Sequence, residues 1–204
     1  MNHRNLKIAL ASAALAVSGA AMADGPAWSF VQGQAGWGDC FDDCQNTRYG
    51  ASGSVALFNA MHLALTFTTG KLDEAGADDV DVDVWEGRVG GHFGVSDNAD
   101  VFAEARLGNV DAEGGGDEDY YGGAFGVRVM LTDNVEVNGG AEALYADDSE
   151  SNFVSGFIGG RYNFTDAFSF GVTYTDDNLR YLDQDSLDLD LRWSFADFGW
   201  LGND

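Results

Sequence analysis

Apolar and polar residues alternate along most of the chain, in segments of about ten residues that two kinds of connection separate. The first kind is a short turn phrase that recurs about every 35 residues, at 58–61, 95–98, 131–134 and 164–167. The second kind is a longer, acidic and Gly-rich loop. Alternation of period two predicts β-strands with one apolar and one polar face. A repeat of short turn, strand, long loop and strand is typical of an antiparallel up-and-down β-barrel.

The pattern predicts ten strands. We expect them at 27–37, 47–58, 61–70, 80–94, 100–109, 119–131, 135–145, 152–164, 168–175 and 185–195. The last strand alternates most clearly, with Leu187, Leu189, Leu191, Trp193 and Phe195 opposite Asp188, Asp190, Arg192 and Ser194. In the fourth strand the apolar parity changes between Val84 and Trp85, which a bulge or an extension above a membrane would explain.

Two observations indicate that the apolar faces point outward into lipid, rather than inward as in a soluble barrel or sandwich. Aromatic residues gather at the predicted strand ends, as interfacial girdles require, for example Trp28 near the short turns and Tyr49 near the long loops. Short and long connections also alternate strictly, as periplasmic turns and extracellular loops do. The predicted fold is therefore an all-β transmembrane up-and-down antiparallel β-barrel of ten strands, with eight strands as the alternative.

The N-terminus has the features of a secretory signal. Arg4 and Lys7 precede a ten-residue apolar run at 8–17, and Ala21-Met22-Ala23 supplies the small residues of a cleavage site. The run is too short to span a bilayer, so residues 1–23 are expected to be a cleaved signal peptide. The barrel is expected to cover residues 24–195, followed by a C-terminal tail at 196–204.

The charge of the chain excludes one class of partner. Its formal net charge is −24, and removal of Arg4 and Lys7 leaves eight basic residues against 34 acidic ones, a net charge of −26. Such a polyanion repels nucleic acid, so no nucleic-acid binding is expected.

With its signal peptide, Ser-Asp-Asn and Thr-Asp-Asn turns, and final strand 187–195, the sequence resembles the small outer-membrane β-barrel proteins of Gram-negative bacteria, the OmpA/OmpX-like group. The resemblance covers essentially the whole mature chain and implies a place in the outer membrane, surrounded by its lipid. It also implies delivery by periplasmic chaperones and insertion by the outer-membrane assembly machinery, which reads an aromatic-ended last strand. The assembly signal would be Leu187, Leu189, Leu191, Trp193 and Phe195. The tail 196–204 departs from the pattern, because such barrels commonly end at the aromatic residue.

If the apolar faces meet lipid, twelve charged residues point into the lumen. These are Arg48, Arg88, Arg106, Arg128, Arg161, Arg192, Glu86, Glu104, Glu136, Glu142, Asp188 and Asp190. The favoured interpretation is a network of ion pairs that plugs the barrel, because an unpaired charge in a poorly hydrated interior is costly. The alternative is a narrow polar pore, in which inward-facing Gly126, Gly140 and Gly171 provide space.

The loops contain a cysteine pair and most of the acidic residues. Cys40 and Cys44 lie in the first long loop, and an oxidising periplasm favours a disulfide between them over a zinc site. Carboxylates are dense in the other long loops, where divalent cations are possible partners. We favour a solvated, repulsive surface instead, with no metal site and no cofactor, since no loop has the spacing of an EF-hand.

Candidate catalytic residues are few. His62 and His92 fall near the short turns, away from the extracellular half in which an outer-membrane hydrolase would need its acid, base and nucleophile. The predicted function is therefore non-enzymatic: a surface-exposed structural or interaction barrel with an ion-paired lumen and acidic loops. The alternatives are a narrow, cation-preferring, porin-like channel and, less favoured, a lipid-modifying hydrolase.

Overall fold

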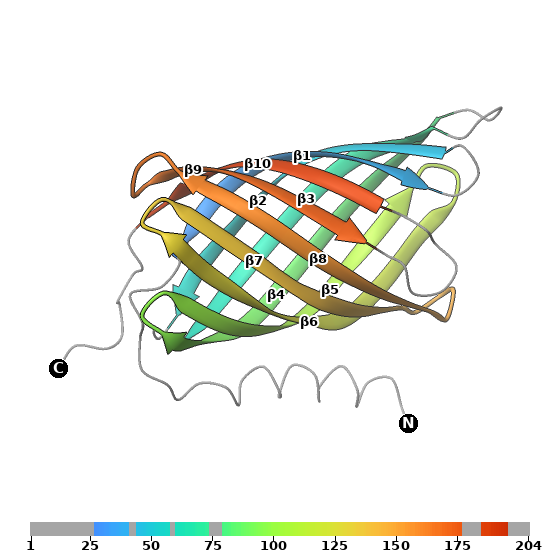
Figure 1. Ribbon diagram of the computed structural model, residues 1–204. Helices are drawn as coiled ribbons and strands as arrows, with labels where there is room; N and C mark the ends of the chain where they lie inside the picture. The colour runs from blue at the N-terminus through green and yellow to red at the C-terminus, as the bar shows by residue number, and fades with distance from the viewer. Residues whose placement is uncertain (1–26, 41–43, 58–59, 74–78, 177–184, 196–204) are drawn as a thin grey trace, which may run out of the picture.

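The computed structural model describes residues 27–40, 44–57, 60–73, 79–176 and 185–195. Ten antiparallel strands run consecutively around one closed sheet, and the first strand pairs with the last (Figure 1). The strands are β1 (Phe30–Cys40), β2 (Cys44–Leu57), β3 (Met61–Asp73), β4 (Val80–Ser96), β5 (Ala99–Ala112), β6 (Gly116–Thr132), β7 (Val135–Ala146), β8 (Ser151–Asn163), β9 (Phe168–Asp176) and β10 (Asp185–Ser194). The predicted fold and the count of ten strands are confirmed, and the eight-strand alternative is wrong.

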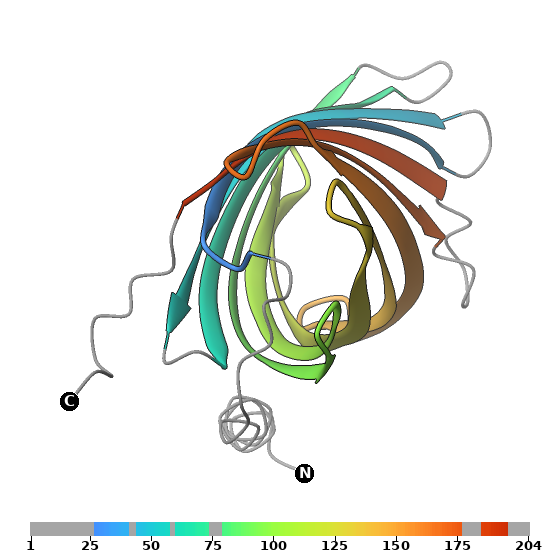
Figure 2. The same cartoon turned by 60° about the vertical axis from the view of Figure 1, so that its left-hand side comes forward.

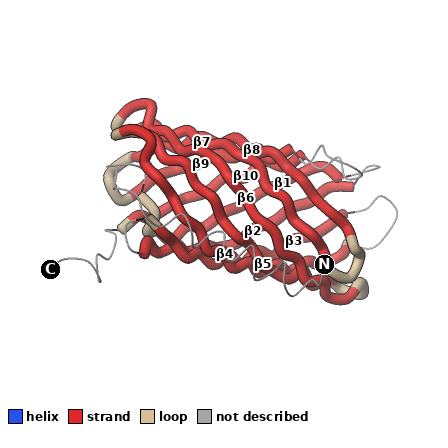
Figure 3. Tube along the Cα trace, turned by 90° about the horizontal axis from the view of Figure 1, so that it is seen from below, coloured by secondary structure: helices blue, strands red, loops and turns tan. Residues whose placement is uncertain are grey.

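The strands are tilted across the barrel axis and cross in projection between the near and far walls (Figure 3). The connections after β2, β4, β6 and β8 lie at one end, here called the short-turn end, and those after the odd-numbered strands lie at the long-loop end. β1 begins and β10 ends at the short-turn end, so Phe30 and Ser194 lie side by side there. Within the described residues, no helix has the length and hydropathy that a membrane span needs.

The outer wall of the barrel is apolar. Large hydrophobic side chains stand on it with high exposed fractions, such as Leu191 at 66%, Phe125 at 65% and Leu65 at 61%. Buried polar and charged side chains lie on the inner wall, including Glu104, Arg128 and Glu136. This is the reverse of a soluble barrel and is the arrangement that a lipid solvent requires.

Two details differ from the predicted strands. The change of parity in β4 involves no bulge at Val84–Trp85, because the register with β3 runs without interruption from Val80 to Gly91. Val82 and Val84 face the lumen while Trp85 faces outward, so the predicted bulge is wrong at this point. A register shift occurs instead at Gly94/Ser96, beside the short turn. The first strand also starts later than predicted, at Phe30, because residues 27–29 leave the wall.

Candidate functional site

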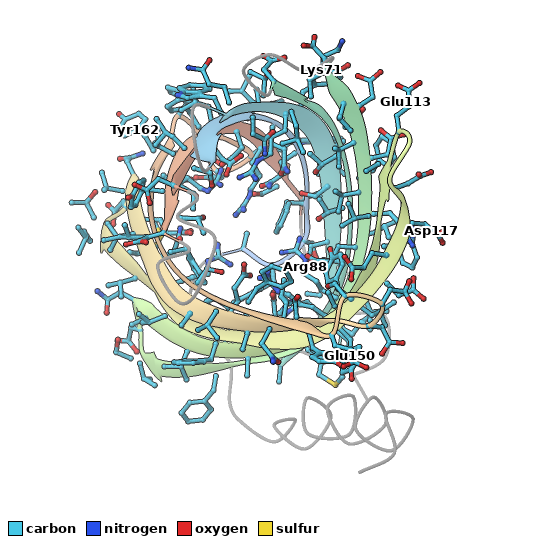
Figure 4. All side chains as sticks on the ribbon, turned by 90° about the vertical axis from the view of Figure 1, so that its right-hand side faces the viewer. Lys71, Arg88, Glu113, Asp117, Glu150 and Tyr162 are labelled. Atoms are coloured by element: carbon cyan, nitrogen blue, oxygen red, sulfur yellow. The ribbon has the colours of Figure 1, made fainter. Side chains whose placement is uncertain are left out.

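A cavity of about 480 Å³ occupies the lumen, and we call it the main cavity. All twelve charged residues that alternation assigns to the lumen line it. Looking into the long-loop end, Arg88 points into the interior, whereas Lys71, Glu113, Asp117 and Glu150 lie around the rim (Figure 4). The twelve charged residues come from seven of the ten strands: β2, β4, β5, β6, β7, β8 and β10.

The half of the lumen near the long loops is polar and sparsely paired. Arg48 donates through Nε and Nη2 to the two carboxylate oxygens of Asp188, at 2.9 and 2.5 Å, and through Nη2 to Ser186 Oγ. The Arg48 and Asp188 side chains remain 31% and 21% exposed, so water reaches this pair. Uncharged Gln34, Thr68 and Thr175 contribute much of the remaining wall.

A denser network crosses the middle of the lumen. Arg106 pairs with Glu142 and, through Nη2 at 3.0 Å, with Glu104. The second Glu104 oxygen lies 2.9 Å from His62 Nε2. Arg88 lies 3.5 Å from Glu86, whose carboxylate also accepts a 3.2 Å hydrogen bond from the Tyr120 hydroxyl. Neighbouring pairs share carboxylates, so the charges support one another across β4, β5, β6 and β7.

The space beside the inward glycines is occupied. A Cβ on Gly126 would meet the Phe102 ring, one on Gly140 would meet the Phe157 ring, and one on Gly171 would meet the Arg161 and Asp190 side chains. These three glycines were expected to open the lumen in the pore interpretation. They instead admit bulky side chains from neighbouring strands, and that close approach is the reason for glycine there.

Trp28 packs inside the short-turn end of the lumen, against residues of β3, β4 and β5. Its ring stacks against both His62 and His92, whose centroids lie 4.5 Å from it and 6.2 Å from each other, and the Phe102 ring packs against it edge-on. Trp28 Nε1 donates to Asp100 at 3.1 Å, and the Arg128 guanidinium lies 4.5 Å from the Trp28 ring. Trp28 is 6% exposed, so its predicted place in an outer aromatic girdle is wrong. It precedes β1, where strand parity no longer determines its direction.

Hydrogen bonds fix the backbone next to Trp28. Ser29 is 0% exposed; its hydroxyl accepts the Ala56 N–H at 2.9 Å and its carbonyl accepts the Phe195 N–H at 3.1 Å. Arg128 Nη1 also donates to the Ala27 carbonyl. The start of the described chain, in blue, accordingly bends into the mouth of the barrel (Figure 2).

A second cavity of about 600 Å³ lies at the short-turn end, and we call it the short-turn cavity. Four charged residues line both cavities: Arg128, Glu136, Arg161 and Arg192. We call these four side chains the septum. Arg128 donates to both oxygens of Glu136, at 3.0 and 2.9 Å, and the pair is almost completely buried. Arg161 Nη2 lies 2.8 Å from Asp190.

Several predicted features lie outside the described residues. These include the signal peptide at 1–23, the tail at 196–204, and part of the acidic loops. Backbone register places Cys40 opposite Cys44 at the end of the β1–β2 hairpin, but the side chains of the predicted disulfide are outside the described residues. Among the residues that the structure does describe, no group of three His, Cys, Asp or Glu side chains is placed to hold a metal ion.

The predicted assembly strand forms the seam of the barrel. Leu191 and Trp193 of β10 are exposed on the outer wall, and β10 pairs with β1 from Ser186 to Ser194. Phe195 follows the last strand residue, and its N–H is the donor to Ser29.

No family model and no curated protein matches this chain. Solved structures do match its fold. The β domain of the Bordetella autotransporter Brka is 10% identical, with a TM-score of 0.54 over 83% of this chain and all of that one. An outer-membrane channel from Pseudomonas putida F1 is 8% identical, with a TM-score of 0.54 over 83% and 96% of the two chains.

The translocator domain of the autotransporter NalP from Neisseria meningitidis is 10% identical, with a TM-score of 0.51 over 95% of this chain and 96% of that one. The chain is similar in fold to outer-membrane β-barrels. At these identities the likeness establishes the fold alone, and the role of the protein has to be argued from its own lumen and surface.

Proposed function

We propose that the protein is a bacterial outer-membrane β-barrel with a closed lumen and a structural or interaction role at the cell surface, where it displays its acidic loops. The apolar outer wall supports a place in lipid. The fold that it shares with known outer-membrane barrels supports the same location.

One observation carries the closed-lumen proposal: Trp28 packs inside the short-turn end of the barrel, and the septum separates the short-turn cavity from the main cavity. Trp28 is held by two stacked imidazoles, a hydrogen bond to Asp100 and the adjacent Ser29 contacts. The aromatic and ion-paired side chains beside Gly126, Gly140 and Gly171 support the same conclusion, because they occupy space that a pore would need.

Conductance in planar lipid bilayers tests this proposal directly. The purified protein, shown to be folded by its heat-modifiable mobility on unboiled gels, is expected to insert without stable unit openings. Reproducible unit openings of the wild-type protein would overturn the closed lumen and establish the channel instead.

A narrow, cation-preferring channel is the second candidate. The main and short-turn cavities support it, since both are lined by the septum and only side chains separate them. The acidic rim would concentrate cations at its mouth. Reversal potentials under a salt gradient would measure the preference, if openings occur.

We propose a non-enzymatic role because the imidazole rings of His62 and His92 both pack against Trp28. His62 is 1% exposed and bound to Glu104, so its imidazole is shielded from a lipid substrate. A lipid-modifying hydrolase would lose activity in His62→Ala or His92→Ala. Unchanged outer-membrane lipid in cells that overproduce the wild type and each variant is the expected result.

Partners follow from the same proposal. Outer-membrane lipid would surround the apolar wall, while periplasmic chaperones and the assembly machinery would handle the chain before closure. Replacement of Trp193 and Phe195 by Ser is expected to reduce the heat-modifiable form in cells. Undiminished insertion would contradict the role of this strand as the assembly signal.

A further inference from the structure

The septum and the adjacent Asp190 together have one more positive charge than negative charge. Three arginines converge there, Arg128, Arg161 and Arg192, with two carboxylates, Glu136 and Asp190. Both Glu136 oxygens accept from Arg128, and both Asp190 oxygens lie within 2.9 Å of Arg161 Nη2. Glu136 is therefore engaged by Arg128 through both oxygens, and Asp190 forms its ion pair with Arg161, although only its Oδ2 accepts a hydrogen bond.

Arg192 is the arginine that remains. Its Nε donates to the neutral Gln32 Oε1 at 3.0 Å, and its guanidinium carbon lies 3.8 Å from the Phe30 ring centroid. Among the described residues, no carboxylate lies within ion-pair distance of Arg192. Since it lines both cavities, its unassigned Nη groups can be reached from either side.

The surroundings of Arg192 define the ligand that would fit. An uncompensated guanidinium in a poorly hydrated interior favours a counter-ion, and a surplus of one charge calls for a monovalent anion. The Phe30 face and Gln32 fix the plane of the guanidinium, so its free edge presents two parallel donors. That geometry matches the two oxygens of a carboxylate better than it matches a spherical ion.

We propose that Arg192 forms a binding site for a small monovalent carboxylate inside the lumen, between the main cavity and the short-turn cavity. The site stands apart from the acidic rim of the barrel and does not require the lumen to conduct. It makes the septum the place where an overall acidic protein retains a small anion.

Titration with [¹³C]formate, followed by broadening of its carbon signal, tests the site. The protein is purified from the membrane fraction in a zwitterionic detergent, at constant ionic strength. Wild-type protein should broaden the signal saturably. Arg192→Gln should weaken binding about tenfold or more, the loss expected when a charged donor pair is removed.

Arg48→Gln is the matched control, because it also removes one luminal positive charge but from a pair that Asp188 already neutralises. Its formate binding should equal that of the wild type. Equal weakening in both variants, or no saturable broadening by the wild type, would overturn the site.

Arg192→Lys separates the effect of the two parallel guanidinium donors from the effect of the positive charge. It also tests the proposal if Arg192→Gln does not reach the heat-modifiable form. It retains the charge but has no bidentate edge, so weaker formate binding is expected. Wild-type affinity in Arg192→Lys, or equal competition by chloride at equal concentration, would overturn the assignment to carboxylates.

Discussion

The two halves of the lumen accommodate their charged side chains in different ways. Near the long loops, Arg48 and Asp188 form a hydrated pair on a wall of threonines and amides. Near the short turns, Arg128 and Glu136 are almost completely buried beside the Trp28 stack. The same kind of ion pair is thus an exposed surface contact at one end and part of a packed core at the other. Closure and stability should therefore reside in the short-turn half.

The largest effect is expected from Trp28→Ala. Loss of a buried aromatic ring should lower the free energy of unfolding by about 3–5 kcal/mol. Urea titration of the refolded protein in detergent would measure it. The same variant should show unit openings in planar bilayers that the wild type does not show. Trp37→Ala is the control, because Trp37 lies exposed on the outer wall. Equal effects of the two variants would show that Trp28 contributes no more to stability and closure than a tryptophan on the outer wall.

Breaking one ion pair in each half should give the next largest difference. Glu136→Gln leaves Arg128 buried without a carboxylate partner and should cost about 3 kcal/mol of unfolding free energy. Asp188→Asn should cost about 1 kcal/mol or less, because Arg48 stays partly hydrated. Urea titration of both variants makes the comparison. Similar losses of unfolding free energy would show that the two ion pairs are equally shielded from water.

Alanine at paired glycines would sharpen the comparison further. A Cβ at Gly171 would press on the buried Arg161–Asp190 pair, and one at Gly36 on the hydrated Arg48–Asp188 pair. Gly171→Ala should cost about 1–3 kcal/mol, because the packed side chains have little room to move. Gly36→Ala should cost less, since the Arg48 and Asp188 side chains are partly exposed and have room to move, whereas Arg161 and Asp190 are buried. The midpoint of thermal loss of the heat-modifiable form would rank them, and the opposite order would contradict the packing difference.

The smallest effect is expected at the rim. Lys71 lies 3.8 Å from Asp79 and 3.6 Å from Asp81, and all three side chains are more than half exposed. Lys71→Ala should change the free energy of unfolding by about 0.5 kcal/mol or less, and added salt should erase the change. A large, salt-resistant loss would show that the rim is more structured than these contacts indicate.

The alternation of side chains along each strand allowed most of the luminal residues to be predicted from the sequence. Once the apolar faces of two strands are assigned outward, Glu104, Arg106 and Arg161 have to face the lumen, because side chains alternate with period two. Phe102 and Phe157 have the same parities as Glu104 and Arg161, so alternation contained their inward direction as well. Their inward direction was not predicted, because aromatic residues in a membrane barrel are expected at the outer girdles.

Other features depend on tertiary contacts that periodicity does not encode. Trp28 lies outside every strand, and its position is determined by tertiary contacts such as its hydrogen bond to Asp100 and its stacking on two distant histidines. Likewise, the twelve charged residues predicted to face the lumen are six arginines and six carboxylates, and the sequence does not indicate which arginine lacks a partner. That assignment needs the closed barrel, in which β6, β7, β8 and β10 bring their side chains to one level.

The contact between Ser29 and Phe195 has a consequence for the order of folding events. The seam joins residues as distant as Gln32 and Arg192, 160 positions apart, so it can form only after the final strand has been added. The Ser29 carbonyl accepts its hydrogen bond from the residue just beyond that strand. Ser29 therefore gains this hydrogen bond last although it lies near the beginning of the chain, and the bond marks the closing step rather than the first pairing of strands.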